Sequence, residues 1–201
     1  MKAYHTLVTG SSGGGKTTLL RELHETFPGL SIWVNHSGES GVAGKRASGQ
    51  QAMRSSDRNL INLQVGDADS GCELAREFAR EYTSATGYPA QIIVDEAHNT
   101  SLSDGEGALK QGLHEDRDHR IKWVPATQSP QDLKESRGYP GINQCQWIVW
   151  VGTSKTFQSG FINHYNLDDA GLPEEQYKFH KILPSRPPRV VYKGETKREF
   201  A

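Results

Sequence analysis

Gly10-Ser11-Ser12-Gly13-Gly14-Gly15-Lys16-Thr17 is the stretch of this sequence that decides the fold. It matches the pattern G-x-x-x-x-G-K-[ST] at every position. Residues 6–9 before it are rich in β-forming types, and residues 17–27 after it have the periodicity of a helix. A strand, a glycine-rich loop and a helix in this order predict a backbone loop that wraps a phosphate group. The alternative is a glycine- and serine-rich turn with an isolated lysine.

Each residue type in the loop has a chemical reason to be there. Glycines let the backbone curl so that several N–H groups point at one phosphate, and the start of the following helix adds positive potential. Lys16 can reach the β- and γ-phosphates, and the Thr17 hydroxyl can ligate Mg²⁺. We therefore predict that the loop binds ATP with Mg²⁺. The predicted nucleotide-binding residues are Gly10, Ser11, Ser12, Gly13, Gly14, Gly15, Lys16, Thr17 and Thr18.

A second segment carries two adjacent carboxylates. Residues 91–94 are predicted to form a buried strand, in which Ile92, Ile93 and Val94 are continuously apolar, and Asp95-Glu96 follow directly. Such a strand would carry the pair to the carboxyl edge of a sheet, beside the phosphate loop. Asp95 would then hold Mg²⁺ through its water shell, and Glu96 would polarise the attacking water as general base. The alternative is an ordinary strand end with a solvated Asp-Glu pair.

A third polar element follows the predicted strand at residues 121–127, which ends in Thr127-Gln128. A glutamine amide at a strand end can form a hydrogen bond with the γ-phosphate or with the attacking water. Gln128 is therefore predicted to be a catalytic sensor, and the alternative is a polar residue that begins a loop.

Strands and helices alternate along the chain. This alternation predicts an α/β fold with a mostly parallel central sheet and helices on both faces. Residues 177–183 and 189–193, on either side of a proline-rich stretch, predict a small C-terminal β-hairpin. We divide the chain into a P-loop ATPase core at 1–152 and a C-terminal extension at 153–201, packed on the core in the same domain. Further strands are predicted at 30–34, 59–65 and 145–151, helices at 50–56, 73–83 and 109–114, and a long functional loop at 37–49.

The composition is that of a globular protein, with 34% apolar and 23% charged residues. The two cysteines, Cys72 and Cys145, are expected to be buried apolar residues in a reducing compartment. The first residues contain no apolar signal region, and no apolar run approaches the ~18 residues of a membrane span. A net charge of −1 gives no global basic field. We therefore expect a cytoplasmic protein without a transmembrane segment.

The three motifs together resemble the FtsK–HerA superfamily of DNA-pumping ATPases, in which Thr127-Gln128-Ser129-Pro130 is the most discriminating element. Compact members include genome-packaging ATPases of membrane-containing archaeal and bacterial viruses. The resemblance covers residues 3–152 and implies a RecA-like (ASCE) core, a ring of five or six subunits and ATP-driven translocation of double-stranded DNA. Many members have an acidic residue after the second strand, where this chain has Asn35-His36.

The resemblance also implies partners and an arginine that completes a neighbour's active site. Arg117 and Arg120 lie just before the sensor strand, and Arg137 is a third candidate. With Glu96, Lys16 and Gln128 they make up the predicted catalytic set. A motor of this kind would work in the host cytoplasm or with the virion, docked on a capsid vertex or on membrane-associated proteins.

Two polar segments have less specific patterns. The run His114-Glu115-Asp116-Arg117-Asp118-His119 is dense in metal-ligand types but matches no standard zinc spacing, so we expect a solvated loop or a subunit contact. A basic cluster of Lys45, Arg46, Arg54 and Arg58 could contact DNA phosphates or simply form a solvated face.

The sequence thus predicts an oligomeric, ATP-driven translocase of double-stranded DNA, of the type that packages viral genomes. Two other functions stay open: a nucleotide or small-molecule kinase, and a non-motor switch or assembly protein. The catalytic glutamate and the Thr-Gln element argue against a kinase.

Overall fold

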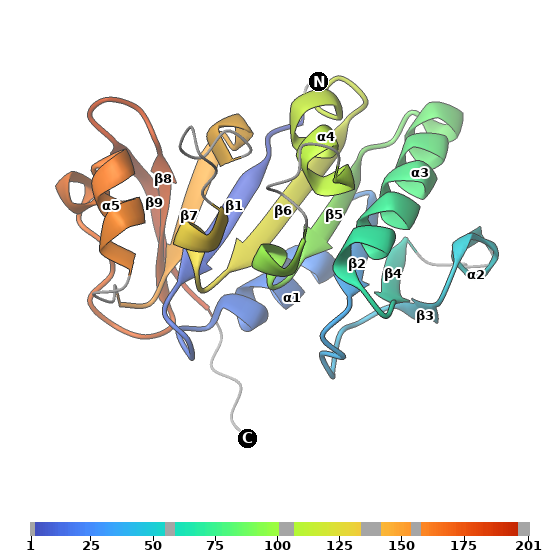
Figure 1. The fold of residues 1–201 in the computed structure, drawn as a ribbon, viewed down its shortest axis with the longest axis horizontal. Coiled ribbons are helices and arrows are strands. Elements are labelled where there is room, and N and C mark those ends of the chain that lie inside the picture. Colours follow the sequence, from blue (N-terminus) through green and yellow to red (C-terminus); the bar gives the residue numbers. More distant parts are fainter. Residues whose placement is uncertain (1–2, 55–58, 101–106, 134–141, 154–157, 197–201) are drawn as a thin grey trace.

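The computed structural model describes residues 3–54, 59–100, 107–133, 142–153 and 158–196. In these residues a nine-stranded sheet has the order β3-β4-β2-β5-β6-β1-β7-β8-β9 (Figure 1). The strands are β1 (Thr6–Gly10), β2 (Leu30–Asn35), β3 (Lys45–Ala47), β4 (Leu60–Gln64), β5 (Ala90–Val94), β6 (Ile121–Thr127), β7 (Trp147–Val151), β8 (Lys178–Leu183) and β9 (Arg189–Glu195).

Seven neighbouring strands, from β3 to β7 in the sheet order, are parallel. Parallel neighbours need crossover connections, which explains why apolar strands alternate with helices along the chain. The last two strands are antiparallel: β8 pairs with β7, and β9 pairs with β8. The predicted α/β fold with a mostly parallel sheet and a C-terminal hairpin is therefore confirmed. The hairpin continues the sheet, because β8 pairs with β7 along its edge.

Helices cover both faces of the sheet, as predicted (Figure 1). On one face α1 packs Leu19 and Leu20 against Trp33 of β2 and its neighbours. On the other face α3, α4 and α5 contribute apolar side chains to the larger core, among them Ala75 and Leu109. The helices are α1 (Lys16–Thr26), α2 (Gln50–Arg54), α3 (Ala68–Thr86), α4 (Ala108–Glu115) and α5 (Ser159–Tyr165).

Three elements differ from the sequence prediction. Helix α3 begins five residues before the predicted start at 73, because the Asp67 side chain caps it by accepting the backbone N–H of Ser70 at 2.8 Å. The predicted loop at 37–49 contains the three-residue strand β3, which is too short for an alternating pattern to show. Helix α5 was not predicted, because its seven residues include glycine and asparagine, which are weak helix formers.

Both cysteines are buried and free, as expected from the sequence. Burial raises the pKa of the Cys145 thiol to about 12, so this group is an inert part of the core. Within the described ranges, the helices are too short or too polar to cross a lipid bilayer.

Candidate active site

The carboxyl ends of β1, β5 and β6 meet at one edge of the sheet, where the structure has a cavity of about 650 Å³. In the sheet β6 lies between β5 and β1, so the loops after these three adjacent strands open at the same place. Lys16 and Thr17 line the cavity after β1, Asp95 and Glu96 after β5, and Gln128 after β6. The three motifs, which are far apart in the sequence, therefore surround one space.

The loop between β1 and α1 has a backbone that only glycine adopts easily. Gly13 and Gly15 have φ angles of 69° and 99°. A Cβ atom on Gly14 would lie 2.9 Å from the carbonyl oxygen of Val151. Gly15 is the N-cap of α1 and has no side chain to accept the first helical N–H groups. The helix start can therefore offer these donors to an anion in the cavity.

The Lys16 ammonium folds back over this loop. Its Nζ atom donates hydrogen bonds to the carbonyl oxygens of Ser11 at 2.7 Å and Gly10 at 3.2 Å. These bonds hold a positive charge at the rim of a glycine-rich concavity. Curled N–H groups, a helix N-terminus and a lysine are the donor set that fits a polyphosphate.

Thr17 and Asp95 approach each other across the cavity. The Thr17 hydroxyl lies 3.5 Å from Asp95 Oδ2, which connects residues 78 positions apart. Asp95 is only 7% exposed. Burial raises the pKa of its carboxyl group, and the negative charge of the Glu96 carboxylate also raises it, whereas the hydrogen bond from the Glu96 N–H and the positive charge of Lys16 lower it. A nearby cation would stabilise the ionised form of this buried carboxylate. A hydroxyl beside a carboxylate is a ligand set that fits Mg²⁺, and Thr17 and Asp95 are the residues that would hold it.

Glu96 occupies a turn directly after β5. Its backbone has φ 49° and ψ 47°, a left-handed conformation that costs energy for a residue with a side chain. The Glu96 N–H donates to Asp95 Oδ1 at 2.9 Å, and Asn99 Nδ2 donates to the Glu96 carboxylate at 3.4 Å. This turn lets two consecutive carboxylates line the same cavity, although side chains that alternate along a regular strand would point apart.

The loop that carries Gln128 is held from two sides. His98, which follows the acidic pair, lies with Nδ1 2.9 Å from the Thr127 hydroxyl, and that hydroxyl also accepts the Ser129 N–H at 2.9 Å. The buried Gln158 side chain, just before α5, donates to the Gln128 carbonyl oxygen at 3.1 Å. The loop is thus tied to the turn after β5 through the Thr127 hydroxyl, and to the C-terminal part of the chain through the Gln128 carbonyl oxygen.

Sequence reasoning missed five residues that line the cavity: Ser37, Gly38, Glu39, Ser40 and Tyr177. Glu39 accepts a hydrogen bond from Arg21 at 2.7 Å, and its N–H donates to Asn35 Oδ1 at 2.7 Å. An acidic side chain is therefore present after the second strand, four residues beyond Asn35. The polar loop at 37–49 was the available signal, but its pattern did not show which residue faces the cavity.

Arg117 and Arg120 lie at the opposite edge of the sheet, because they come before β6 and the cavity lies after it. With its amide oxygen turned toward Arg117, Gln146 accepts from both terminal nitrogens at 2.9 and 3.1 Å. Arg120 donates to the Gly87 carbonyl oxygen. Neither arginine lines the cavity of its own chain, and Arg137 lies outside the described residues.

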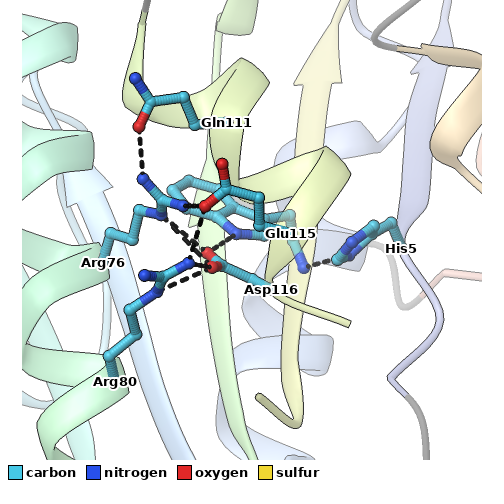
Figure 2. Close-up of polar contacts among 7 residues, drawn as sticks. His5, Arg76, Arg80, Gln111, Glu115 and Asp116 are labelled. Carbon is cyan, nitrogen blue, oxygen red and sulfur yellow. Dashed lines mark hydrogen bonds and ion pairs between the residues drawn. The ribbon is translucent and has the colours of Figure 1, made fainter. Parts of the chain in front are cut away.

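The turn before β6 is anchored by a buried ion-pair cluster (Figure 2). The carboxylate of Asp116 is fully buried and accepts hydrogen bonds from Arg76, Arg80 and the Trp123 indole N–H, the last at 2.9 Å. The more exposed Glu115 carboxylate accepts from the same two arginines. The expectation of a solvated loop is therefore wrong for Asp116, which packs inside the fold. In the described part of the chain, no group of three or more histidine, cysteine, aspartate or glutamate side chains is placed to hold a metal ion.

The structure describes three of the four residues in the basic cluster proposed for DNA contact. Lys45 and Arg46 lie on β3 at one end of the sheet, and the Arg46 side chain is exposed. Arg54 forms a 2.7 Å ion pair with Glu81. Arg58 lies outside the described residues.

Comparison with known proteins places this site in a family. A family profile described as AAA domain matches residues 1–124, which include the phosphate loop and the acidic pair. The chain belongs to the AAA-domain family. The matched range ends within β6, so Gln128 and the C-terminal hairpin lie beyond it.

Solved structures extend the likeness to the whole AAA-domain chain. It is similar to the genome packaging NTPase B204 from Sulfolobus turreted icosahedral virus 2, with 16% identity, a TM-score of 0.73 and 98% of each chain covered. It is also similar to B204, the DNA-packaging ATPase from Sulfolobus turreted icosahedral virus, with 18% identity, a TM-score of 0.72 and 98% of each chain covered.

A bacterial protein also has this fold. The cytoplasmic domain of the type VII secretion ATPase EccC from Thermomonospora curvata is 14% identical with a TM-score of 0.56, and the match covers 98% of this chain and 24% of that one. No curated protein sequence matches the chain. The predicted resemblance to P-loop ATPases of the genome-packaging type is therefore confirmed at the level of the fold.

Proposed function

We propose that this chain is an ATP-driven translocase of double-stranded DNA that works in an oligomeric ring and packages a viral genome. The observation that carries the proposal is the convergence of Lys16 and Thr17 with Asp95 and Glu96 on one cavity. Similarity of fold to two viral packaging NTPases over 98% of each chain supports DNA as the partner.

The residues that line the cavity account for the binding of the nucleotide. The N–H groups of the glycine-rich loop and the start of α1 bind the phosphates, and Lys16 moves from the loop carbonyls to the β- and γ-phosphates. Thr17 and Asp95 would hold Mg²⁺, which would neutralise charge on the phosphate oxygens. Asp95 would have to be ionised for this role, and the charge of a bound cation would favour the ionised carboxylate against the effect of burial.

Hydrolysis depends on the residues that follow β5 and β6. Glu96 accepts a proton from a water molecule whose oxygen attacks the γ-phosphorus, while the bond from phosphorus to the ADP oxygen breaks. The Gln128 amide forms a hydrogen bond with the water or with a γ-phosphate oxygen. Glu39, which lines the same cavity and forms an ion pair with Arg21, adds negative charge near Asp95 and so favours a bound cation.

A ring explains why the candidate arginines lie away from their own cavity. In a head-to-tail ring one edge of each subunit faces a different edge of its neighbour. Arg117 or Arg120, at the amino edge of the sheet, could then reach the cavity of the next subunit, and Arg137 is the third candidate. DNA would pass along the inner surface, with Lys45 and Arg46 of β3 as candidate phosphate contacts.

The test is the rate of phosphate release from ATP, measured with and without duplex DNA. We expect duplex DNA to raise the rate and high salt to remove the stimulation, because phosphate contacts are weakened by counterions. The Lys16→Ala variant is the control for contaminating ATPases and should be inactive in both conditions. A rate that duplex DNA leaves unchanged would reject the translocase, and transfer of the phosphate to a small acceptor would indicate a kinase.

A further inference from the structure

The cavity has two chemically different sides. Asp95, Glu96 and Gln128 follow β5 and β6, on one side of the phosphate loop. Tyr177, which directly precedes β8, lines the cavity on the other side of β1. A triphosphate with its γ end at Glu96 must extend its sugar and base away from β5. It therefore runs toward β7 and β8, which lie on the other side of β1 in the sheet (Figure 1), and Tyr177 directly precedes β8.

The backbone of Tyr177 is attached to the phosphate loop itself. Its N–H donates to the Gly14 carbonyl oxygen at 2.9 Å, and its carbonyl oxygen accepts the Thr196 N–H at 2.7 Å. A Cβ atom built on Gly15 would lie 3.0 Å from Tyr177 Cδ1. The aromatic ring thus borders the last glycine of the loop, and the hairpin of β8 and β9 holds it there.

Tyr177 also has an unfavourable backbone conformation. Its φ angle is 64°, in the left-handed region that bulky side chains rarely adopt. Strain of this kind persists where surrounding bonds fix it, and it is concentrated at binding and catalytic sites. The hydrogen bonds to Gly14 and Thr196 fix the strained residue with its ring at the cavity, whereas a glycine or asparagine would satisfy the same turn at lower cost.

We propose that Tyr177 forms the nucleobase subsite, with the purine ring of the nucleotide stacked on the tyrosine ring. Stacking between bases and aromatic rings is favourable for every base, because each base has a π-face. The C-terminal hairpin then has a direct part in nucleotide binding. This inference rests on the proposed binding of ATP and adds the element that recognises the base.

The test distinguishes the contribution of the base to binding from that of the phosphates. It compares the dissociation constants of Mg-ADP and magnesium pyrophosphate, measured by isothermal titration calorimetry. The Tyr177→Gly variant removes the ring and relieves the positive φ angle, so it should fold. Its dissociation constant for ADP should rise about tenfold, while that for pyrophosphate should change less than about twofold. Tyr177→Phe keeps the ring and should bind both ligands as the wild-type protein does.

Two further variants keep the outcomes distinct. Tyr192→Ala removes an exposed ring from β9 of the same hairpin, outside the cavity, and should change neither constant. ADP binding that survives Tyr177→Gly, or pyrophosphate binding that falls by the same factor as ADP binding, would overturn the nucleobase subsite. Lys16→Ala should strongly weaken the binding of both ADP and pyrophosphate. Unchanged binding of both ligands by this variant would contradict the proposed function rather than the nucleobase subsite.

Discussion

Glu96 is the residue on which hydrolysis, as distinct from binding, depends. Its carboxylate lines the cavity beside the phosphate loop, and a hydrogen bond from its N–H to Asp95 fixes the turn that places it there. The Glu96→Gln variant keeps the shape and the hydrogen bond from Asn99 but cannot accept a proton. We expect it to bind Mg-ATP with unchanged affinity and to release phosphate about 10²–10⁴ times more slowly.

Equilibrium binding and single-turnover hydrolysis measure the two effects separately. Glu25→Gln, at an exposed position of α1, is a matched control that should behave like the wild-type protein. Hydrolysis at the wild-type rate in the Glu96 variant would show that another group activates the water, and Glu39 would then be the first residue to test.

Local pattern was enough to predict the residues whose neighbours in sequence are also their neighbours in space. The glycine-rich loop, Asp95-Glu96 and Gln128 each follow a strand that can be read from its own residues. Glu39 and Tyr177 could not be assigned in this way. The position of the Glu39 side chain depends on its hydrogen bond from Arg21, 18 positions earlier in the chain, and that of Tyr177 depends on pairing between distant strands.

At the scale of elements, the Asp116 cluster joins α3 to α4 and to the start of β6 (Figure 2). The carboxylate of Asp116 is fully buried, whereas the Glu115 side chain, which contacts the same arginines, is 56% exposed. Removing one partner of a buried ion pair leaves charge without compensation. Asp116→Asn should therefore lower the free energy of unfolding by about 3–5 kcal/mol, measured by chemical denaturation.

Glu115→Gln is the internal control for this prediction, because it removes a carboxylate from the same arginines at an exposed position. It should cost no more than about 1 kcal/mol. Equal losses in the two variants would mean that burial of Asp116 does not decide the stability of the cluster. The sequence could not distinguish these neighbours, since burial here depends on how α3 packs on the turn.

His5 connects the start of β1 to β6 and should give stability a dependence on pH. Its Nδ1 accepts the backbone N–H of Trp123 at 3.0 Å, which requires an unprotonated nitrogen. Burial, helped by the positive charge of Arg117, lowers the pKa of His5 to about 4. From about pH 6.5 to pH 4 the unfolded chain therefore binds a proton that the folded chain does not. The free energy of unfolding should fall across this range as the pH drops.

His5→Asn can keep an acceptor for the Trp123 N–H and removes the titrating group. Its unfolding free energy should fall less steeply with decreasing pH than that of the wild-type protein, by up to about 1.4 kcal/mol per pH unit. Since burial also lowers the pKa of His24, only the difference between variant and wild type isolates His5. His119→Asn, at an exposed position, should leave the slope unchanged. Parallel slopes in wild-type protein and His5→Asn would contradict the assignment.

At the scale of the whole molecule, the order of strands and helices could be predicted from the sequence pattern, but the arrangement of subunits in an oligomer could not. Alternating strands and helices predict a mostly parallel sheet, and crossovers between parallel strands bring three separated loops to one edge. A single chain leaves open which surface meets the cavity of a neighbour, because that surface belongs to two subunits. The candidate arginines at the far edge from the cavity are consistent with a site completed by a neighbour.

A ring in which each active site is shared between neighbours makes a prediction about mixtures. Lys16→Ala destroys a subunit's own cavity but leaves its arginines intact. Alanine at the acting arginine leaves the cavity intact and should slow hydrolysis about 10³-fold, because charge on the transferred phosphoryl group is no longer stabilised. Each variant alone should be nearly inactive, whereas a mixture contains interfaces with an intact cavity on one side and an intact arginine on the other. Lys16→Ala is therefore mixed in turn with Arg117→Ala, Arg120→Ala and Arg137→Ala. The mixture in which the substituted arginine is the one that acts on a neighbour should regain ATP hydrolysis. If no mixture regains activity although the variants assemble together, none of the three arginines acts on a neighbouring subunit.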